Sequence, residues 1–233
     1  MKKIVIVVLG VFLYSCSTKT ENNIDWTNLH VVGNDVTDYD GNVYNTVVIN
    51  GSNQTWTTSN LNVSHYRNGD VIPQVTDDLQ WATLTTGAWC YYNNDPATAE
   101  IYGKMYNWYA IKDSRGLAPA GYHIPTDTEW SNLVAAIGGE SVAGQRMKDL
   151  GDSWNETISP ATNTTGYSGL PGGYRYSNGT FSLKGSKGLW WSSTIAESAS
   201  SWSWARYLDK NNSNLSKKYY NNKIGLSVRC VKN

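Results

Sequence analysis

The amino-acid sequence predicts a mixed α+β domain with two helices, a small twisted antiparallel sheet and long loops. Turn signals separate apolar and β-branched runs between residues 36 and 57, a capping signal opens an amphipathic segment at Thr126, and short aromatic runs broken by Gly, Asn and Ser follow Gly151. These signals predict hairpins, a helix and loop-rich short strands, in that order.

Two dipeptides that favour tight turns define the first hairpins. Asp40-Gly41 separates residues 36–39 from the run 43–49, and Asn50-Gly51 precedes residues 55–57. The acidic residues around Gly41 also resemble part of a calcium loop, but the closing Glu of an EF-hand loop is missing. We therefore favour a tight β-turn over a calcium site.

The clearest helix begins at Thr126. This residue can cap the helix while Glu129, three positions on, reaches back to the amide of Thr126. Apolar residues then recur at helical spacing from Trp130 to Ile137, and Gly138-Gly139 ends the segment. A second helix is predicted, despite the unfavourable Gly103, from apolar residues that share a helical face: Tyr102, Met105, Tyr106, Tyr109 and the adjoining Ile111.

The first residues of the chain predict export. Lys2 and Lys3 precede an apolar run over residues 4–13 that is shorter than the roughly 20 residues of a membrane-spanning helix. The run closes on Cys16 in a sequence that resembles a bacterial lipobox, so we expect Cys16 to carry lipid; the alternative is an ordinary secretory signal. The expected organisation is a signal peptide over residues 1–15, a lipid-anchored polar tether over 16–35 and one domain over 36–233, held at the bacterial outer membrane or cell surface.

Composition narrows the classes of partner. Lys and Arg together number 19, as do Asp and Glu, and no clustered basic face predicts a nucleic-acid partner. The 11 Trp and 16 Tyr outnumber the 2 Phe, which favours aromatic positions with one wet end. A surface-rich β fold and a binding face both fit this preference.

Several motifs occur in the order found in a known family. They are residues 39–44 (YDGNVY), 89–95 (WCYYNND), 102–108 (YGKMYNW), 118–126 (APAGYHIPT), 166–175 (GYSGLPGGYR), 190–194 (WWSST) and 227–231 (SVRCV). Together they resemble the Fibrobacter succinogenes major paralogous domain family over about residues 36–233. The resemblance implies an exported or cell-surface bacterial protein with no established activity.

A more distant likeness concerns the fold. The helix opening at Pro125-Thr126 with Glu129-Trp130, and the ending at residues 225–230, are similar to those of C-type-lectin-like folds and the formylglycine-generating enzyme. The implied fold is a C-type-lectin-like or formylglycine-generating-enzyme-like α+β domain. Fold does not imply function, so this likeness assigns no activity.

Two cysteines remain once Cys16 is set aside. In an oxidising compartment Cys90 and Cys230 are expected to form a disulfide, the alternative being two separate buried thiols.

No catalytic apparatus is recognised. The histidines His30, His65 and His123 are scattered, which disfavours a metal site, and the glycine spacing around Ser168 misses the nucleophile elbow. Glu129 is the best-placed acidic residue for glycan hydrolysis, but capping already accounts for it. We therefore expect no enzyme activity, no cofactor and no bound metal, and treat a glycan-active enzyme as the less favoured alternative.

A recognition module is the favoured class, with a glycan or a cell-surface protein as its partner. Aromatic rings stack on sugars, and the segment between Gly166 and Tyr220 is rich in Trp, Tyr, Asn and Ser. Trp190 and Trp191 are expected to point one inward and one outward, while Trp202 and Trp204 share a face and are together either core or platform. The candidate ligand-binding residues are Tyr174, Tyr176, Trp191, Trp202 and Trp204. The alternative is a structural subunit that binds another protein of the cell surface.

Overall fold

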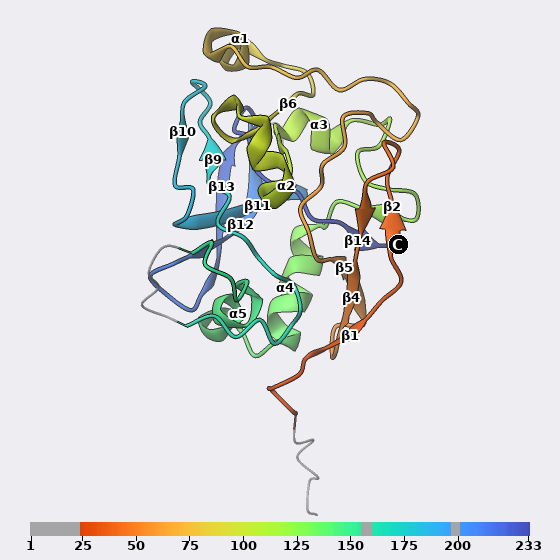
Figure 1. Ribbon diagram of the computed structural model, residues 1–233, viewed down its shortest axis with the longest axis vertical. Coiled ribbons are helices and arrows are strands. Elements are labelled where there is room, and N and C mark those ends of the chain that lie inside the picture. Colours follow the sequence, from red (N-terminus) through yellow and green to blue (C-terminus); the bar gives the residue numbers. More distant parts are fainter. Residues whose placement is uncertain (1–23, 155–159, 197–200) are drawn as a thin grey trace, which may run out of the picture.

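The computed structural model describes residues 24–154, 160–196 and 201–233. It is a mixed α/β structure with several small antiparallel sheets and few helices (Figure 1). Cys16 and the expected signal peptide lie outside the described residues. Within those residues no helix has the length and apolar character needed to cross a membrane.

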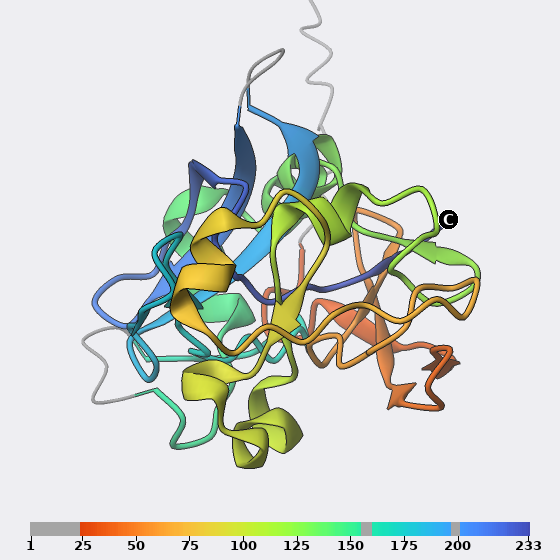
Figure 2. The same cartoon turned by 90° about the horizontal axis from the view of Figure 1, so that it is seen from above.

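The largest sheet has five antiparallel strands in the order β1-β4-β5-β14-β8. Its strands are β1 (His30–Val32), β4 (Thr46–Ile49), β5 (Gln54–Thr57), β14 (Val231–Lys232) and β8 (Tyr122–His123). The C-terminal strand therefore lies among the early strands of the domain, as the view from above shows (Figure 2). Because β1 pairs with β4, residues 30–32 belong to the folded domain rather than to the expected tether.

The second sheet has three long antiparallel strands in the order β11-β12-β13. These strands are β11 (Lys187–Ile195), β12 (Trp202–Asp209) and β13 (Leu215–Asn221). The expectation of only short strands beyond Gly151 is wrong here. Two-stranded ribbons complete the strand set: β2 (Val36–Thr37) with β3 (Val43–Tyr44), β6 (Trp89–Cys90) with β7 (Met105–Tyr106), and β9 (Tyr174–Arg175) with β10 (Phe181–Ser182).

Both hairpin predictions are confirmed. The turn between β2 and β3 closes with the Gly41 amide donating to the Asp38 carbonyl at 3.2 Å, and Gly41 has a φ of 87°. The Asp38 side chain accepts from the amides of Asp40 and Asn42, which fixes a β-turn. The β4–β5 hairpin closes over Asn50-Gly51 as expected.

The helix predicted at Thr126 is also confirmed. α4 (Asp127–Ala136) opens with the capping box of Thr126 and Glu129, and its apolar stripe from Trp130 to Ile137 is buried. Gly138 and Gly139 both have a φ of 93°, a conformation that ends the helix at little cost for glycine. α4 lies between the five-stranded and three-stranded sheets, where its stripe joins Trp56 and Trp190 in one core cluster (Figure 1).

The second predicted helix is wrong. Gly103, with a φ of 66°, ends the short helix α2 (Ala99–Tyr102), and the chain then enters strand β7. Asn107 caps a separate short helix, α3 (Trp108–Lys112). The described residues also include α1 (Asp78–Thr83), the 3₁₀ turns η1 (Tyr92–Asn94) and η2 (Pro96–Thr98), and α5 (Glu140–Met147), so there are more helices than the two expected.

Candidate functional site

The three-stranded sheet places its outward aromatic residues by strand alternation. Trp202, Trp204 and Arg206 share one face of β12. In the register of β12 and β13, Trp204 lies opposite Tyr219 and Arg206 lies opposite Lys217. Farther along the same face the sheet is covered by α4 and α5 (Figure 1).

We call Trp202, Trp204 and Tyr219 the aromatic ledge. The Tyr219 ring packs edge-on against both indoles, with centroid distances of 5.8 Å to Trp202 and 5.5 Å to Trp204. Trp202 is 45% exposed and Tyr219 is 51% exposed, whereas Trp204 is half-buried. The ledge therefore presents two accessible rings on a rigid pair of strands.

A lysine and an aspartate border the ledge. The Nζ of Lys217 lies 3.9 Å from the Trp204 ring centroid and 2.6 Å from Oδ2 of Asp127. A cation–π contact at the protein surface contributes about 0.5–1 kcal/mol. Asp127 thus holds Lys217 against one ring of the ledge.

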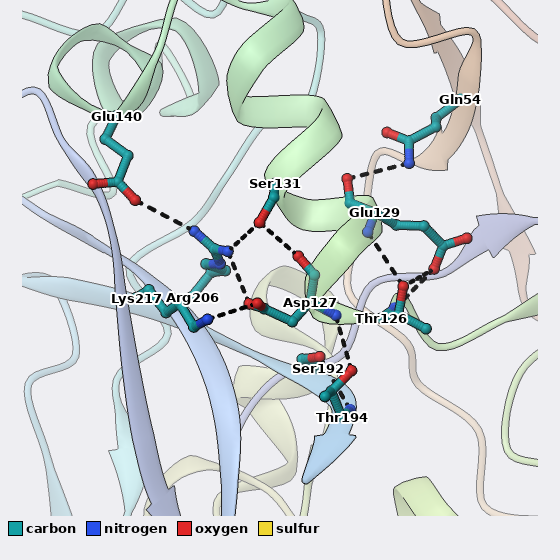
Figure 3. Close-up of polar contacts among 10 residues, drawn as sticks. All are labelled: Gln54, Thr126, Asp127, Glu129, Ser131, Glu140, Ser192, Thr194, Arg206 and Lys217. Carbon is teal, nitrogen blue, oxygen red and sulfur yellow. Dashed lines mark hydrogen bonds and ion pairs between the residues drawn. The ribbon is translucent and has the colours of Figure 1, made fainter. Parts of the chain in front are cut away.

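Asp127 is itself fixed by α4 and by the sheet (Figure 3). Its Oδ1 lies 2.8 Å from Nη2 of Arg206, whose side chain is only 3% exposed. The same Nη2 donates to Ser131 Oγ at 2.9 Å, and Nη1 lies 3.7 Å from Glu140. The Asp127 amide lies 3.0 Å from Thr194 Oγ1 on β11. This network joins the start of α4 to all three strands.

Glu129, the best-placed acidic residue in the sequence, serves the helix cap (Figure 3). Its Oε2 accepts from the Thr126 amide and hydroxyl at 2.8 Å, and its Oε1 lies 2.7 Å from Nε2 of His123. Burial opposes ionisation of Glu129, but these partners together lower its pKa. The geometry is that of a charged, fully engaged capping carboxylate.

The five residues proposed for ligand binding do not form one site. Trp202 and Trp204 share a face, as expected, but Tyr174 and Tyr176 pack on the opposite face of the sheet, where Tyr174 contacts Tyr220. Tyr174 is 8% exposed and Tyr176 is 41% exposed, so only the second ring is accessible.

The prediction for Trp191 is wrong. Its side chain is fully buried, and its indole donates to the Tyr106 carbonyl at 2.8 Å. Trp190 is also fully buried, so the expectation of one inward and one outward ring fails as well. The two rings point to opposite faces, but each face of β11 is covered by a different core cluster.

The predicted Cys90–Cys230 disulfide is not formed. Both side chains are free buried thiols, and they belong to different core clusters. Burial raises the pKa of each thiol to about 12. The cysteines therefore act as small apolar core residues. Among the described residues, no group of three or more His, Cys, Asp or Glu side chains is arranged to hold a metal ion.

Sequence reasoning missed Tyr219, Lys217 and Asp127. Tyr219 and Tyr220 are adjacent in a strand, so one of them had to share the face of Trp204 once the pairing of β12 and β13 was known. Asp127 carried a visible signal only as a first-turn acidic residue of α4. Its ion pairs come from residues 79 and 90 positions away.

Fold and site together define a small α+β domain that displays an aromatic ledge on one face of its three-stranded sheet. The chain belongs to the Fibrobacter succinogenes major domain family, whose model matches residues 49–232. No curated protein and no solved structure matches the chain.

Proposed function

We propose that this chain is an exported surface lipoprotein whose domain is a non-catalytic recognition module that binds carbohydrate or mediates adhesion. The observation that supports this proposal is the aromatic ledge, with Trp202 and Tyr219 accessible on one face of the three-stranded sheet. The N-terminal sequence supports export, with Lys2 and Lys3 before an apolar run that closes on Cys16.

The chemistry of the ledge suits sugar rings. The apolar faces of a pyranose stack on indole and phenol rings, while its hydroxyls need polar partners nearby. Asn221 lies opposite Trp202 in the strand register, and Lys217 lies beside Trp204. One stacked pair contributes about 0.5–1.5 kcal/mol beyond area burial, so adhesion requires several contacts or many copies.

A glycan screen with matched variants tests the proposal. The full chain is applied to an array of polysaccharides and host glycans, beside Trp202→Ala, Tyr219→Ala and Tyr176→Ala. Tyr176 is similarly exposed but lies on the opposite face. We expect each of the two ledge variants to lose about threefold to tenfold in apparent affinity, because each loses one stacked ring, and Tyr176→Ala to bind as the wild type does. Equal losses in all three variants, or no glycan bound by the wild type, would contradict the proposal.

A structural subunit that binds another surface protein is the second candidate. It is favoured by β1, an edge strand of the five-stranded sheet that exposes Val31 and Val32. Exposed edge strands are templates for pairing with another chain. Val32→Lys would abolish such pairing and leave glycan binding unchanged, which separates the two candidates.

We further propose kinship with C-type-lectin-like and formylglycine-generating-enzyme-like folds. The capped helix at Thr126 and the pairing of the C-terminal strand β14 with β5 support it. An experimental structure that superposes on neither fold would contradict it.

A further inference from the structure

Two adjoining hollows form a groove that contains none of the ledge residues. The first has a volume of about 180 Å³ and includes Tyr39 and His65 in its wall. The second, of about 230 Å³, includes His123 and Ser193. Arg67, Leu117 and Ala118 line both hollows, so the two are parts of one groove with Arg67 between its ends.

Arg67 is held in place by backbone carbonyls. Its Nε and Nη2 lie 3.0 and 2.9 Å from the Ala118 carbonyl oxygen, and Nη2 lies 3.0 Å from that of Tyr122. Whereas Arg115, Arg175 and Arg206 each pair with a carboxylate, no such ion pair of Arg67 occurs in the described part of the chain. The side chain is exposed, and Nη1 has no protein acceptor among the described residues. A guanidinium fixed in this way loses little conformational entropy when it binds an anion.

The ends of the groove offer rings and oriented histidines. Tyr39 is 58% exposed, and its ring lies 5.6 Å from that of His65. Nδ1 of His65 contacts Asp40. At the other end His123 is held between Glu129 and Asn233. Tyr39 thus supplies a stacking surface beside the cation.

The nearby carboxylates are already engaged. Asp38 is buried and accepts from the hydroxyl of Tyr44 and from Asn42. Burial opposes ionisation of Asp40, but the Ser64 amide, His65 and Lys104 lower its pKa. Both carboxylates are therefore engaged by local hydrogen-bond donors, with Lys104 as a cation near Asp40, which leaves the charge of Arg67 for a ligand.

We infer that this groove is a second glycan-binding element in which Arg67 binds the carboxylate of an acidic sugar, so that uronate-containing polysaccharides are the ligand class. The inference rests on the proposed function as a carbohydrate-binding module and adds its substrate class. An exposed guanidinium pairs with a carboxylate by charge-assisted hydrogen bonds, and Tyr39 stacks on the neighbouring ring.

The groove and the aromatic ledge border the same helix end. Ser193, in the second hollow, donates its amide to the Pro125 carbonyl, and the next residue, Thr194, contacts the Asp127 amide. Asp127 in turn holds Lys217 against the ledge. A single polysaccharide that contacts both elements would gain affinity from multiple weak contacts.

Calorimetry on the full chain tests the inference with trigalacturonate and with neutral galactotriose of the same linkage. We expect trigalacturonate to bind at least tenfold more tightly than the neutral trimer, and the preference to fall with added salt. Arg67→Gln should remove the preference, and Arg67→Lys should restore part of it. Arg115→Gln, which changes an exposed arginine already paired with Asp113 and Asp70, is the control and should leave binding unchanged.

The outcomes are distinguishable. Equal affinity for both trimers, or an acidic preference that survives Arg67→Gln, overturns this inference alone, whereas no binding of any saccharide by the wild type overturns the proposed function as well. Binding of polyglutamate with no binding of trigalacturonate would identify an acidic-peptide site and also overturn it. If Arg67→Gln does not fold, Tyr39→Ala takes its place. Loss of this ring at the rim of the groove should weaken the binding of both trimers equally, by about threefold to tenfold, because each trimer loses one aromatic stack. Unchanged binding by Tyr39→Ala would place the sugar elsewhere.

Discussion

The two ion pairs of Asp127 should differ several-fold in strength, because one partner is buried and the other is exposed. The Arg206 side chain is 3% exposed, and removing Asp127 leaves it the Ser131 hydroxyl and one carboxylate, that of Glu140, at 3.7 Å. Breaking a buried pair costs about 3–5 kcal/mol, so with Glu140 as partial compensation we expect a coupling free energy of about 2–3 kcal/mol. Lys217 is more exposed, and such pairs contribute about 0.2–1 kcal/mol.

Two double-mutant cycles measure these couplings. One combines Asp127→Asn with Arg206→Met and the other combines it with Lys217→Met, each followed by urea unfolding with tryptophan fluorescence. Salt at 1 M should reduce the Lys217 coupling and leave most of the Arg206 coupling, since screening acts mainly on exposed charges. A Lys217 coupling equal to or larger than that of Arg206 would refute the ranking by burial. It would also mean that Lys217, beside the ledge, holds Asp127 more strongly than the buried Arg206 does.

Three further predictions concern the cysteines, the α5 contact and the helix cap. Cys90 and Cys230, each with a pKa of about 12, should resist iodoacetamide in the native protein and react after unfolding. Dithiothreitol should leave the Tm unchanged, and a Tm that falls on reduction would show that the two cysteines do form a disulfide. Gly144→Ala should lower the free energy of unfolding by about 1–3 kcal/mol, because a Cβ there would lie 2.6 Å from the Ser213 carbonyl oxygen. The control Ser141→Ala, on the exposed side of α5, should change it by no more than about 0.5 kcal/mol. Equal losses for both variants in urea unfolding would contradict the contact. Because the folded-state pKa of Glu129 is lowered, its contribution to stability is present above the ordinary Glu pKa and is lost as pH falls through the folded-state pKa. Glu129→Gln should therefore flatten the plot of unfolding free energy against pH below about pH 4.5. An unchanged loss of stability in acid would exclude Glu129 as its source.

The elements predicted correctly from the sequence are those specified by neighbouring residues. Asp40-Gly41 and Asn50-Gly51 set their turns locally, and Thr126 with Glu129 sets the start of α4 within one helical turn. Family membership was also predicted from ordered motifs, and the family model confirms it. Lipid attachment at Cys16, carbohydrate binding and surface location remain predictions.

The elements predicted wrongly depend on distant partners. Met105 and Tyr106 have helical spacing with their neighbours, but they pair with Trp89 and Cys90 as a strand. α5 has few apolar residues and is positioned by the Gly144 amide donating to the Ser213 carbonyl at 2.6 Å, a contact across 69 positions that local pattern does not encode.

The candidate site shows the same division. That Trp202 and Trp204 share a face follows from strand alternation alone, whereas their exposure depends on where α4 begins beside the sheet. Trp191 obeys the same alternation and is buried because a second core cluster covers its face. The sequence of a single strand therefore predicts which side chains share a face of the sheet, but not which face is covered by other elements of the domain.

The preference for Trp and Tyr over Phe has a structural cause beyond wet surface positions. Short strands and long loops leave many buried backbone carbonyls without a ladder partner, and an unpaired buried carbonyl costs about 1–3 kcal/mol. Indole groups supply donors at two such places, Trp89 to Ile72 and Trp108 to Ser192. Trp154 and Trp191 add a second donor to the carbonyls of Gly169 and Tyr106, which also accept backbone amides. Arg229 acts in the same way, donating to the carbonyls of Thr57, Tyr167 and Ser168. Phenylalanine fills similar volume but has no donor, so a loop-rich core of this kind selects indoles where a helix bundle or a long sheet would not need them. These indole donors therefore make part of the high Trp count a property of the scaffold, and they do not account for the accessible rings of Trp202 and Tyr219.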